Sequence, residues 1–581
     1  MAQEELKGPE GSAGAQRVSL DSYGSCVRHN SDGLQRRLDN RQIQLIAIGG
    51  TIGTGLFVTI GGGLAKGGPA SLLIAYTLYA CVVALVNNSI AEMSTYMPVS
   101  GGFIRLAGVW VDEALGFMVG WNYFLYEALL IPFEITALNL VLSFWNEKVT
   151  EPGPTAGICA AIIVAYGLMN VAAVGVFGEA EFWLSGGKVL LIFILFLFTF
   201  ITMVGGNPAH DAYGFRHFSN PGAFATYMTT GDTGRMEGFM GALATATFTV
   251  VGPDYISMIA AEAKHPSLYI KSAFKTVYLR FGLFFVGAAL TCGIVVPYND
   301  PTLVKIYIDG TASGGTAAAS PWVMAMENLG IQGLPHLVNA LLFTTIFSAG
   351  NTYTYCATRS LYSLAMDGRA PAVFRKTTKN GVPIWCFAFT MIFPMLSFLQ
   401  CGSGSAKVLN WLLALITGGG VINYLVMSIT FLNFHRACKV QNFDRPATIV
   451  VLTYGWSAFR PTFSVGDFFS NYTMQIVAPI LFIFWKVIKR TKYVRPEVLD
   501  LQWDRPIIEA YEDHLMTREP PNTFWREMLQ MVGIGRNKVI KGEKAYPKTI
   551  LFDELSEAEF KGYMNTRCAG KGRQLREKFH Y

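Results

Sequence analysis

Glycine and threonine gather in one short stretch of the first long apolar segment, residues 43–64. The stretch from Ala47 to Phe57 reads AIGGTIGTGLF. A helix in hydrocarbon must satisfy its own backbone amides, and each glycine weakens it by about 1 kcal/mol relative to alanine. An opened helix at this depth would present free amide donors and a positive half-helix end, which together suit a carboxylate. The same residues equally suit a closely packed helix seam, so the stretch alone favours neither interpretation.

A second interruption lies in the sixth apolar segment, residues 237–261, where Gly252, Pro253 and Asp254 follow one another. Proline removes a backbone donor and clashes with the preceding turn of a helix. A buried acid is costly in a bilayer, which makes Asp254 a functional candidate. Asp254 could also cap the half-helix that follows a proline kink, and both roles can hold together. Interruptions in the first and sixth segments are typical of a transporter with five helices per inverted repeat.

Ionisable and polar side chains inside other apolar segments are further candidates. Glu127 and Glu134 lie in the third segment, and Glu134 is the better candidate for a proton site, or else a carboxylate paired within the bundle. Lys188, in the fifth segment, is either a functional cation or a side chain that snorkels to the interface. In the eighth segment, Ser348 and Asn351 either line a polar path or hydrogen-bond neighbouring helices.

The composition indicates which elements must position these residues. The chain has 581 residues, of which 51% are hydrophobic and only 15% charged, whereas soluble proteins carry about 25% charged residues. Twelve apolar runs, most of them near the ~20 residues that span a bilayer, cover approximately 43–64, 70–96, 114–145, 156–176, 182–204, 237–261, 275–297, 336–366, 383–400, 407–433, 447–459 and 472–488. We therefore expect an all-α polytopic membrane protein with about twelve transmembrane helices, built as a five-plus-five inverted repeat with interrupted helices 1 and 6.

Basic residues fix the expected orientation. Lysine and arginine are concentrated in alternate short loops, which places both termini in the cytoplasm and requires an even number of spans. A disordered cytoplasmic tail (1–42) would precede the transmembrane domain (43–488), and a cytoplasmic tail (489–581) would follow it. Segment 447–459 is short for a span, so either it crosses a locally thinned bilayer or residues are missing near Arg445; we favour the second explanation.

Several functional classes are excluded by what the sequence lacks. It contains no P-loop, no nucleophile elbow and no dinucleotide fingerprint, so we expect neither an enzyme nor a bound cofactor. The nine cysteines show no paired spacing, and no cluster has the spacing of a metal site. A net charge of +6 is too mild to indicate nucleic-acid binding.

The motifs taken together resemble those of a known family. The blocks that carry the resemblance are the Gly49–Phe57 stretch, the segment from Gly67 to Pro98, the sequence FGEAEFW at 177–183 followed by Lys188, and the segment from Arg359 to Pro383. The chain resembles fungal amino-acid permeases, the yeast amino acid transporter family within the amino acid–polyamine–organocation superfamily. The resemblance extends over roughly residues 41 to 525 and implies a plasma-membrane importer that takes up amino acids by proton symport.

The resemblance also assigns roles to individual residues. Backbone amides of the first break are implied to hold the substrate carboxylate, at Thr51, Gly53, Thr54 and Gly55. The break at Gly252 and Asp254 is implied to face the substrate amino group, with Phe248 as an aromatic gate. Lys188 is implied to stand where sodium-driven relatives bind their ion. The expected partners are therefore an amino acid or related small zwitterion, protons and the lipid bilayer.

The chain departs from the family pattern in two places that bear on the substrate. The family commonly shows G-x-E where this chain has Gly252-Pro253-Asp254, and tryptophan where it has Tyr424. The shorter acid and the proline resemble a branch associated with carnitine or polyamines. A carnitine- or polyamine-type permease is therefore one alternative. A nutrient sensor of the same fold that does not transport is another, suggested by the long C-terminal tail.

Overall fold

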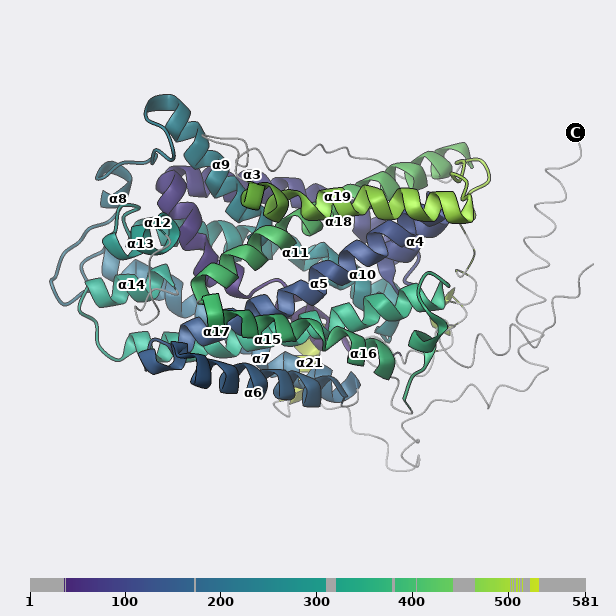
Figure 1. Cartoon of the computed structure of the whole chain (residues 1–581), viewed down its shortest axis with the longest axis horizontal. Coiled ribbons are helices and arrows are strands. Elements are labelled where there is room, and N and C mark those ends of the chain that lie inside the picture. Colours follow the sequence, from purple (N-terminus) through teal and green to yellow (C-terminus); the bar gives the residue numbers. More distant parts are fainter. Residues whose placement is uncertain are drawn as a thin grey trace, which may run out of the picture. The chain divides into compact units, whose positions relative to one another are not determined.

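A computed structural model gives the arrangement of the helices (Figure 1). It describes residues 36–531 apart from 37, 172–173, 310–319, 379–381, 404, 442–464 and several positions between 502 and 522. Segment 447–459 and most of the two predicted tails therefore lie outside the described residues. Within the described residues every regular element is a helix, and the one β-bridge joins Leu38 to Ala263. The predicted all-α fold is confirmed.

Most of the principal helices overlap the predicted apolar segments. They are α2 (Asn40–Gly49), α3 (Ile60–Tyr96), α4 (Gly102–Trp110), α5 (Glu113–Leu142), α6 (Pro152–Val171), α7 (Val174–Met203), α9 (Gly231–Thr249), α10 (Pro253–Ile259), α11 (Pro266–Arg280), α12 (Gly287–Val295), α15 (Leu334–Met366), α16 (Ile384–Thr390), α18 (Ser405–Val440), α19 (Val465–Lys489) and α21 (Phe524–Met531). Eight helices in the described part are long and apolar enough to cross a membrane.

The first two predicted spans run on into each other. The π-turn Gly55–Thr59 and α3 form one 42-residue helical stretch, interrupted only at Gly68. Gly68 has a φ of 79°, and a Cβ there would lie 2.7 Å from the amide nitrogen of Ala225. Only glycine fits this conformation and this contact. The sequence boundary at about residues 64–70 is therefore a kink and not a loop.

The predicted interruptions of helices 1 and 6 are both present. Helix α2 ends at Gly49 and the helical path resumes at Gly55, whereas α9 ends at Thr249 and α10 begins at Pro253. Helix α5 packs against both α15 and α18, and all three lie close together in Figure 1. Because α5 carries Glu127 and Glu134, this packing brings both acids into the interior, where their side chains are fully buried.

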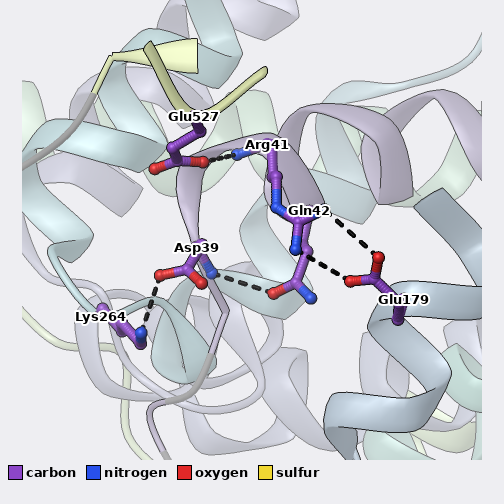
Figure 2. A network of polar contacts seen from close by, with 6 residues as sticks. All are labelled: Asp39, Arg41, Gln42, Glu179, Lys264 and Glu527. Atoms are coloured by element: carbon purple, nitrogen blue, oxygen red, sulfur yellow. Dashed lines mark hydrogen bonds and ion pairs between the residues drawn. The ribbon is translucent and has the colours of Figure 1, made fainter. Parts of the chain in front are cut away.

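The start of α2 is capped and charged (Figure 2). Asp39 and Gln42 form a capping box, in which the Asp39 amide donates to Gln42 Oε1 at 3.1 Å. Such a box satisfies two of the donors that a helix start leaves open. Lys264, which follows the second break, places its Nζ 2.8 Å from Asp39 Oδ1. The first and sixth helices are thereby joined at this end of the bundle.

Arg41 joins two further segments to the same place (Figure 2). Its guanidinium pairs with Glu179 of α7 at 2.9 Å, and its backbone amide donates to Glu527 Oε2 of α21 at 2.8 Å. Helix α21 packs on α2 through Glu527, while Trp525 stays exposed. We call Asp39, Lys264, Arg41, Glu179 and Glu527 the α2 latch.

Candidate functional site

The first break is closed on the α2 side by Thr51. Its hydroxyl donates to the carbonyls of Ala47 and Ile48, both at 3.1 Å, and its amide donates to Ile48. These bonds occupy carbonyls that the end of a helix would otherwise leave open. The Thr51 hydroxyl therefore terminates α2.

Thr54 connects the first break to α5. Its hydroxyl donates a short hydrogen bond to Glu134 Oε2, and its backbone amide also faces that carboxylate. Thr54 is completely buried, and Glu134 is 1% exposed. A carboxylate of the protein thus lies against donors of the first break, where the sequence places the carboxylate of a substrate.

Two glycines in the first break permit close approach of other helices. A Cβ on Gly53 would lie 2.8 Å from Ala349 Cβ and 3.0 Å from Glu134 Oε1. A Cβ on Gly55 would lie 3.3 Å from the ring of Phe248. The contact at Gly53 leaves no room for a side chain, whereas that at Gly55 is only tight. Part of this stretch is therefore a closely packed helix seam and part of it is an opened helix, so each of the two interpretations is partly correct.

The second break meets the first. Gly252 has a φ of 156°, and a Cβ there would lie 3.2 Å from Thr51 Cγ2. Asp254, in the first turn of α10, is 2% exposed. Phe248, just before the break, packs edge to face on Phe133 with ring centroids 5.3 Å apart. The residues predicted from the two interruptions are thus brought to one place.

Hydroxyl groups that the sequence did not single out hold the two breaks together. Thr249 Oγ1 lies 3.3 Å from the carbonyl of Gly55, and Tyr76 donates to Thr249 at 3.0 Å. Tyr353 of α15 donates to the carbonyl of Gly50 at 3.1 Å. Threonine and tyrosine are common in apolar helices, so only the helix breaks nearby could have identified these residues as part of the site.

Lys188 lies at the first break and not at the interface. Its side chain is completely buried, and its Nζ donates to the carbonyl of Gly49, the last residue of α2. The alternative of a snorkelling lysine is therefore wrong. Glu134 and Glu181 are its charged neighbours. The cluster holds one buried cation and two buried carboxyl groups, so the gain or loss of a single proton changes its net charge.

Ser348 and Asn351 reach this cluster through Glu181. Ser348 donates to Glu181 Oε1, and the Asn351 amide lies 3.5 Å from Glu181 Oε2. Ser185 donates to the same Oε1 at 3.0 Å. Both α15 side chains thus hydrogen-bond a neighbouring helix, as one of the two interpretations expected. Glu181 itself was missed; its i, i+4, i+7 relation to Ser185 and Lys188 was the available signal.

Helices broken at two points, with buried charges where the breaks meet, define a helical membrane transporter. The chain matches the family model for amino acid permeases over residues 42–496. It is 40% identical over 507 residues to the general amino acid permease AGP2 of Saccharomyces cerevisiae, covering 82% of this chain and 84% of that protein. The chain belongs to the amino acid permease family, which confirms the resemblance.

Other relatives differ in their named substrates. A proline-specific permease of Emericella nidulans is 36% identical over 517 residues, covering 85% of this chain and 92% of that protein. A dicarboxylic amino acid permease of Saccharomyces cerevisiae is 34% identical over 503 residues, covering 83% and 81%. These relatives therefore make the family clear, but their names specify different amino acids as substrates.

Proposed function

We propose that this protein imports amino acids or related small zwitterions across the plasma membrane by proton symport. The observation that carries the proposal is the close approach of the two breaks, where a Cβ added to Gly252 would lie 3.2 Å from Thr51 Cγ2, together with the buried cluster of Glu134, Lys188 and Glu181. A site at the meeting of two interrupted helices is where inverted-repeat transporters bind substrate. Family membership supports amino acids as the class carried.

The substrate carboxylate binds the backbone amides of Gly53, Thr54 and Gly55, and Thr51 shapes the rim of this site. Amide donors at a helix start and the positive end of its dipole favour an anion. The amino group faces the second break at Gly252 and Asp254. Phe248 covers the site as an aromatic gate, because its ring already lies against Gly55.

Glu134 couples the proton to the substrate. As a carboxylate it accepts the Thr54 donors that a substrate carboxylate needs. A proton on Glu134 removes its charge and weakens that hold, since hydrogen bonds to charged acceptors are the stronger ones. The substrate carboxylate then takes the donors, and Lys188 keeps a negative partner throughout. One proton would enter with each carboxylate group.

An uptake panel tests the proposal. Cells lacking their own permeases, and expressing this chain, are given radiolabelled amino acids, carnitine and spermidine with and without a protonophore. We expect accumulation of at least one amino acid that the protonophore abolishes. Uptake of carnitine or spermidine alone would favour the alternative permease. Binding without accumulation would indicate a nutrient sensor, and accumulation that survives the protonophore would rule out symport.

A further inference from the structure

The second acid of α5 has no role in the site described so far. Glu127 lies seven residues before Glu134, about 10 Å along the helix. Its side chain is completely buried, and neither of its carboxylate oxygens accepts a hydrogen bond of ordinary geometry from the described residues. The Tyr123 and Tyr255 hydroxyls face it, but a carboxylate at this depth that only hydroxyls compensate is among the most costly groups that a membrane protein can hold.

Asp254 is the charged neighbour of Glu127. The two carboxyl groups interact electrostatically, and Asp254 Oδ1 likewise has no hydrogen-bond partner among the described residues. Backbone amides at the start of α10 face Asp254. Each acid of α5 is thus matched to one break: Glu134 to the first, and Glu127 to the second.

The other groups around the pair are uncharged in their ordinary state. They come from α5, α10, α15 and α18, and are Tyr123, Tyr126, Tyr255, Tyr353, Cys356 and Tyr424. Arg359 is the cation that faces these uncharged side chains, through its interaction with Cys356. Its charge is already matched by Glu262, at 2.9 Å.

Two buried carboxylates that interact with each other, and that have no ion pair with a cation among the described residues, cannot both stay ionised in a low-dielectric interior. A proton is the ligand that fits, because it neutralises one carboxylate without needing space, and both side chains are at most 2% exposed. We propose that Glu127 and Asp254 form a buried carboxyl pair that binds one proton, separate from the Glu134–Lys188–Glu181 cluster. The inference deepens the proposed proton symport and rests on it for its role in transport.

The pair would respond to movement of the second break. Asp254 belongs to the short α10, which follows directly on Gly252, whereas Glu127 belongs to the long α5. Any displacement of α10 that opens the site separates the two carboxyls or admits water. Either change lets the second carboxyl ionise and releases the proton. Protonation at the pair and opening at the second break are thereby linked.

Infrared difference spectroscopy on the purified protein, between acidic and neutral pH, tests the pair directly. We expect Glu127→Gln to remove one protonated-carboxyl band and to flatten the pH dependence of uptake. Glu237→Gln is the matched control, because Glu237 is a buried glutamate whose Oε2 accepts from Thr229 at 2.8 Å and 3.0 Å. It should leave the Glu127 band and the pH profile unchanged.

Tyr123→Phe provides a second variant should Glu127→Gln fail to fold. It removes a hydroxyl that faces Glu127 and keeps the ring, so the band should shift in frequency without being lost. An unchanged spectrum in both variants would overturn the proposal. The proposal would also be overturned if Glu127→Gln raised the KM of uptake but left the ratio of protons to substrate unaltered. That result would mean that the pair binds an ammonium group of the substrate. The spectra need no transported substrate, so failure of the proposed transport is seen separately, as an absence of uptake.

Discussion

At the scale of single residues, Gly53 has no room for a side chain. A side chain there meets Ala349 Cβ at 2.8 Å and Glu134 at 3.0 Å, and overpacking of this kind costs about 1–3 kcal/mol. We expect Gly53→Val to lower uptake by about tenfold or more without loss of protein at the cell surface, since 1.4 kcal/mol corresponds to a factor of ten.

The control for this prediction is Gly187→Ala. Nothing lies within 4 Å of a Cβ at Gly187, although it is next to Lys188 in sequence. Uptake and surface expression should match the unaltered protein. Gly55→Ala should give an intermediate loss, because its Cβ would meet a ring at 3.3 Å. Normal uptake by Gly53→Val would show that the first break is not part of the substrate site.

Lys188 supports the second prediction at this scale. Removing it leaves the Gly49 carbonyl without its donor and Glu134 and Glu181 without their neighbouring cation, and an uncompensated buried charge costs about 3–5 kcal/mol. We expect Lys188→Ala to abolish proton-linked accumulation, because the buried cation that balances the charge of Glu134 and Glu181 would be gone. Measured uptake across a pH series checks this. A pH dependence equal to that of the unaltered protein would exclude Lys188 from coupling.

The sequence locates the residues of the site that are anomalies in an apolar segment. Gly53, Asp254 and Lys188 stand out because glycine and charge are unfavourable there. Thr249 and Tyr353 do not, because an uncharged hydroxyl side chain is not anomalous in a membrane helix. Their contacts with carbonyls of the first break depend on how three helices pack, and no local pattern carries that information.

At the scale of elements, the α2 latch binds a helix of the C-terminal segment to the start of the first helix. Burial raises the pKa of Glu527, although the Arg41 amide that donates to it acts in the opposite direction. A carboxyl whose pKa is raised on docking takes up protons more readily when docked. Docking of α21 should therefore be strongest at acidic pH and weaken as pH rises through that raised pKa.

A spin label at Leu529→Cys, in a background without the exposed Cys81, measures this docking, because Leu529 lies on α21 and is 49% exposed. The label should become more mobile as pH rises from near 4.5, the ordinary value for glutamate. In Glu527→Gln the mobility should no longer depend on pH. A pH response retained in that variant would show that another group controls docking.

Helix boundaries were predictable where the apolar pattern is long and poorly predictable at kinks. The sequence separates residues 43–64 from 70–96, but the chain turns at Gly68 and continues as a helix. The turn depends on a glycine with positive φ and on Ala225 packing into it, a contact across more than 150 residues. Hydropathy alone cannot distinguish such a kink from a loop.

At the scale of the whole chain, the α2 latch shows that the first and last described segments lie at the same end of the helices. Arg41 and Glu527, 486 residues apart, are hydrogen-bonded. Two ends on one side fit the even number of spans that the charged loops predict. We expect epitope tags at both termini to bind antibody only after permeabilisation of the cells; binding to intact cells would overturn the cytoplasmic assignment.

The amine that Lys188 offers to the Gly49 carbonyl has a consequence for the medium in which the protein works. A covalently tethered cation occupies its place at an effective concentration set by the fold and not by the solution outside. The end of α2 should therefore need no dissolved metal ion to complete it. Replacing sodium by choline in the uptake buffer should leave the rate unchanged, so that such a permease would serve a cell equally in salt-poor and salt-rich surroundings.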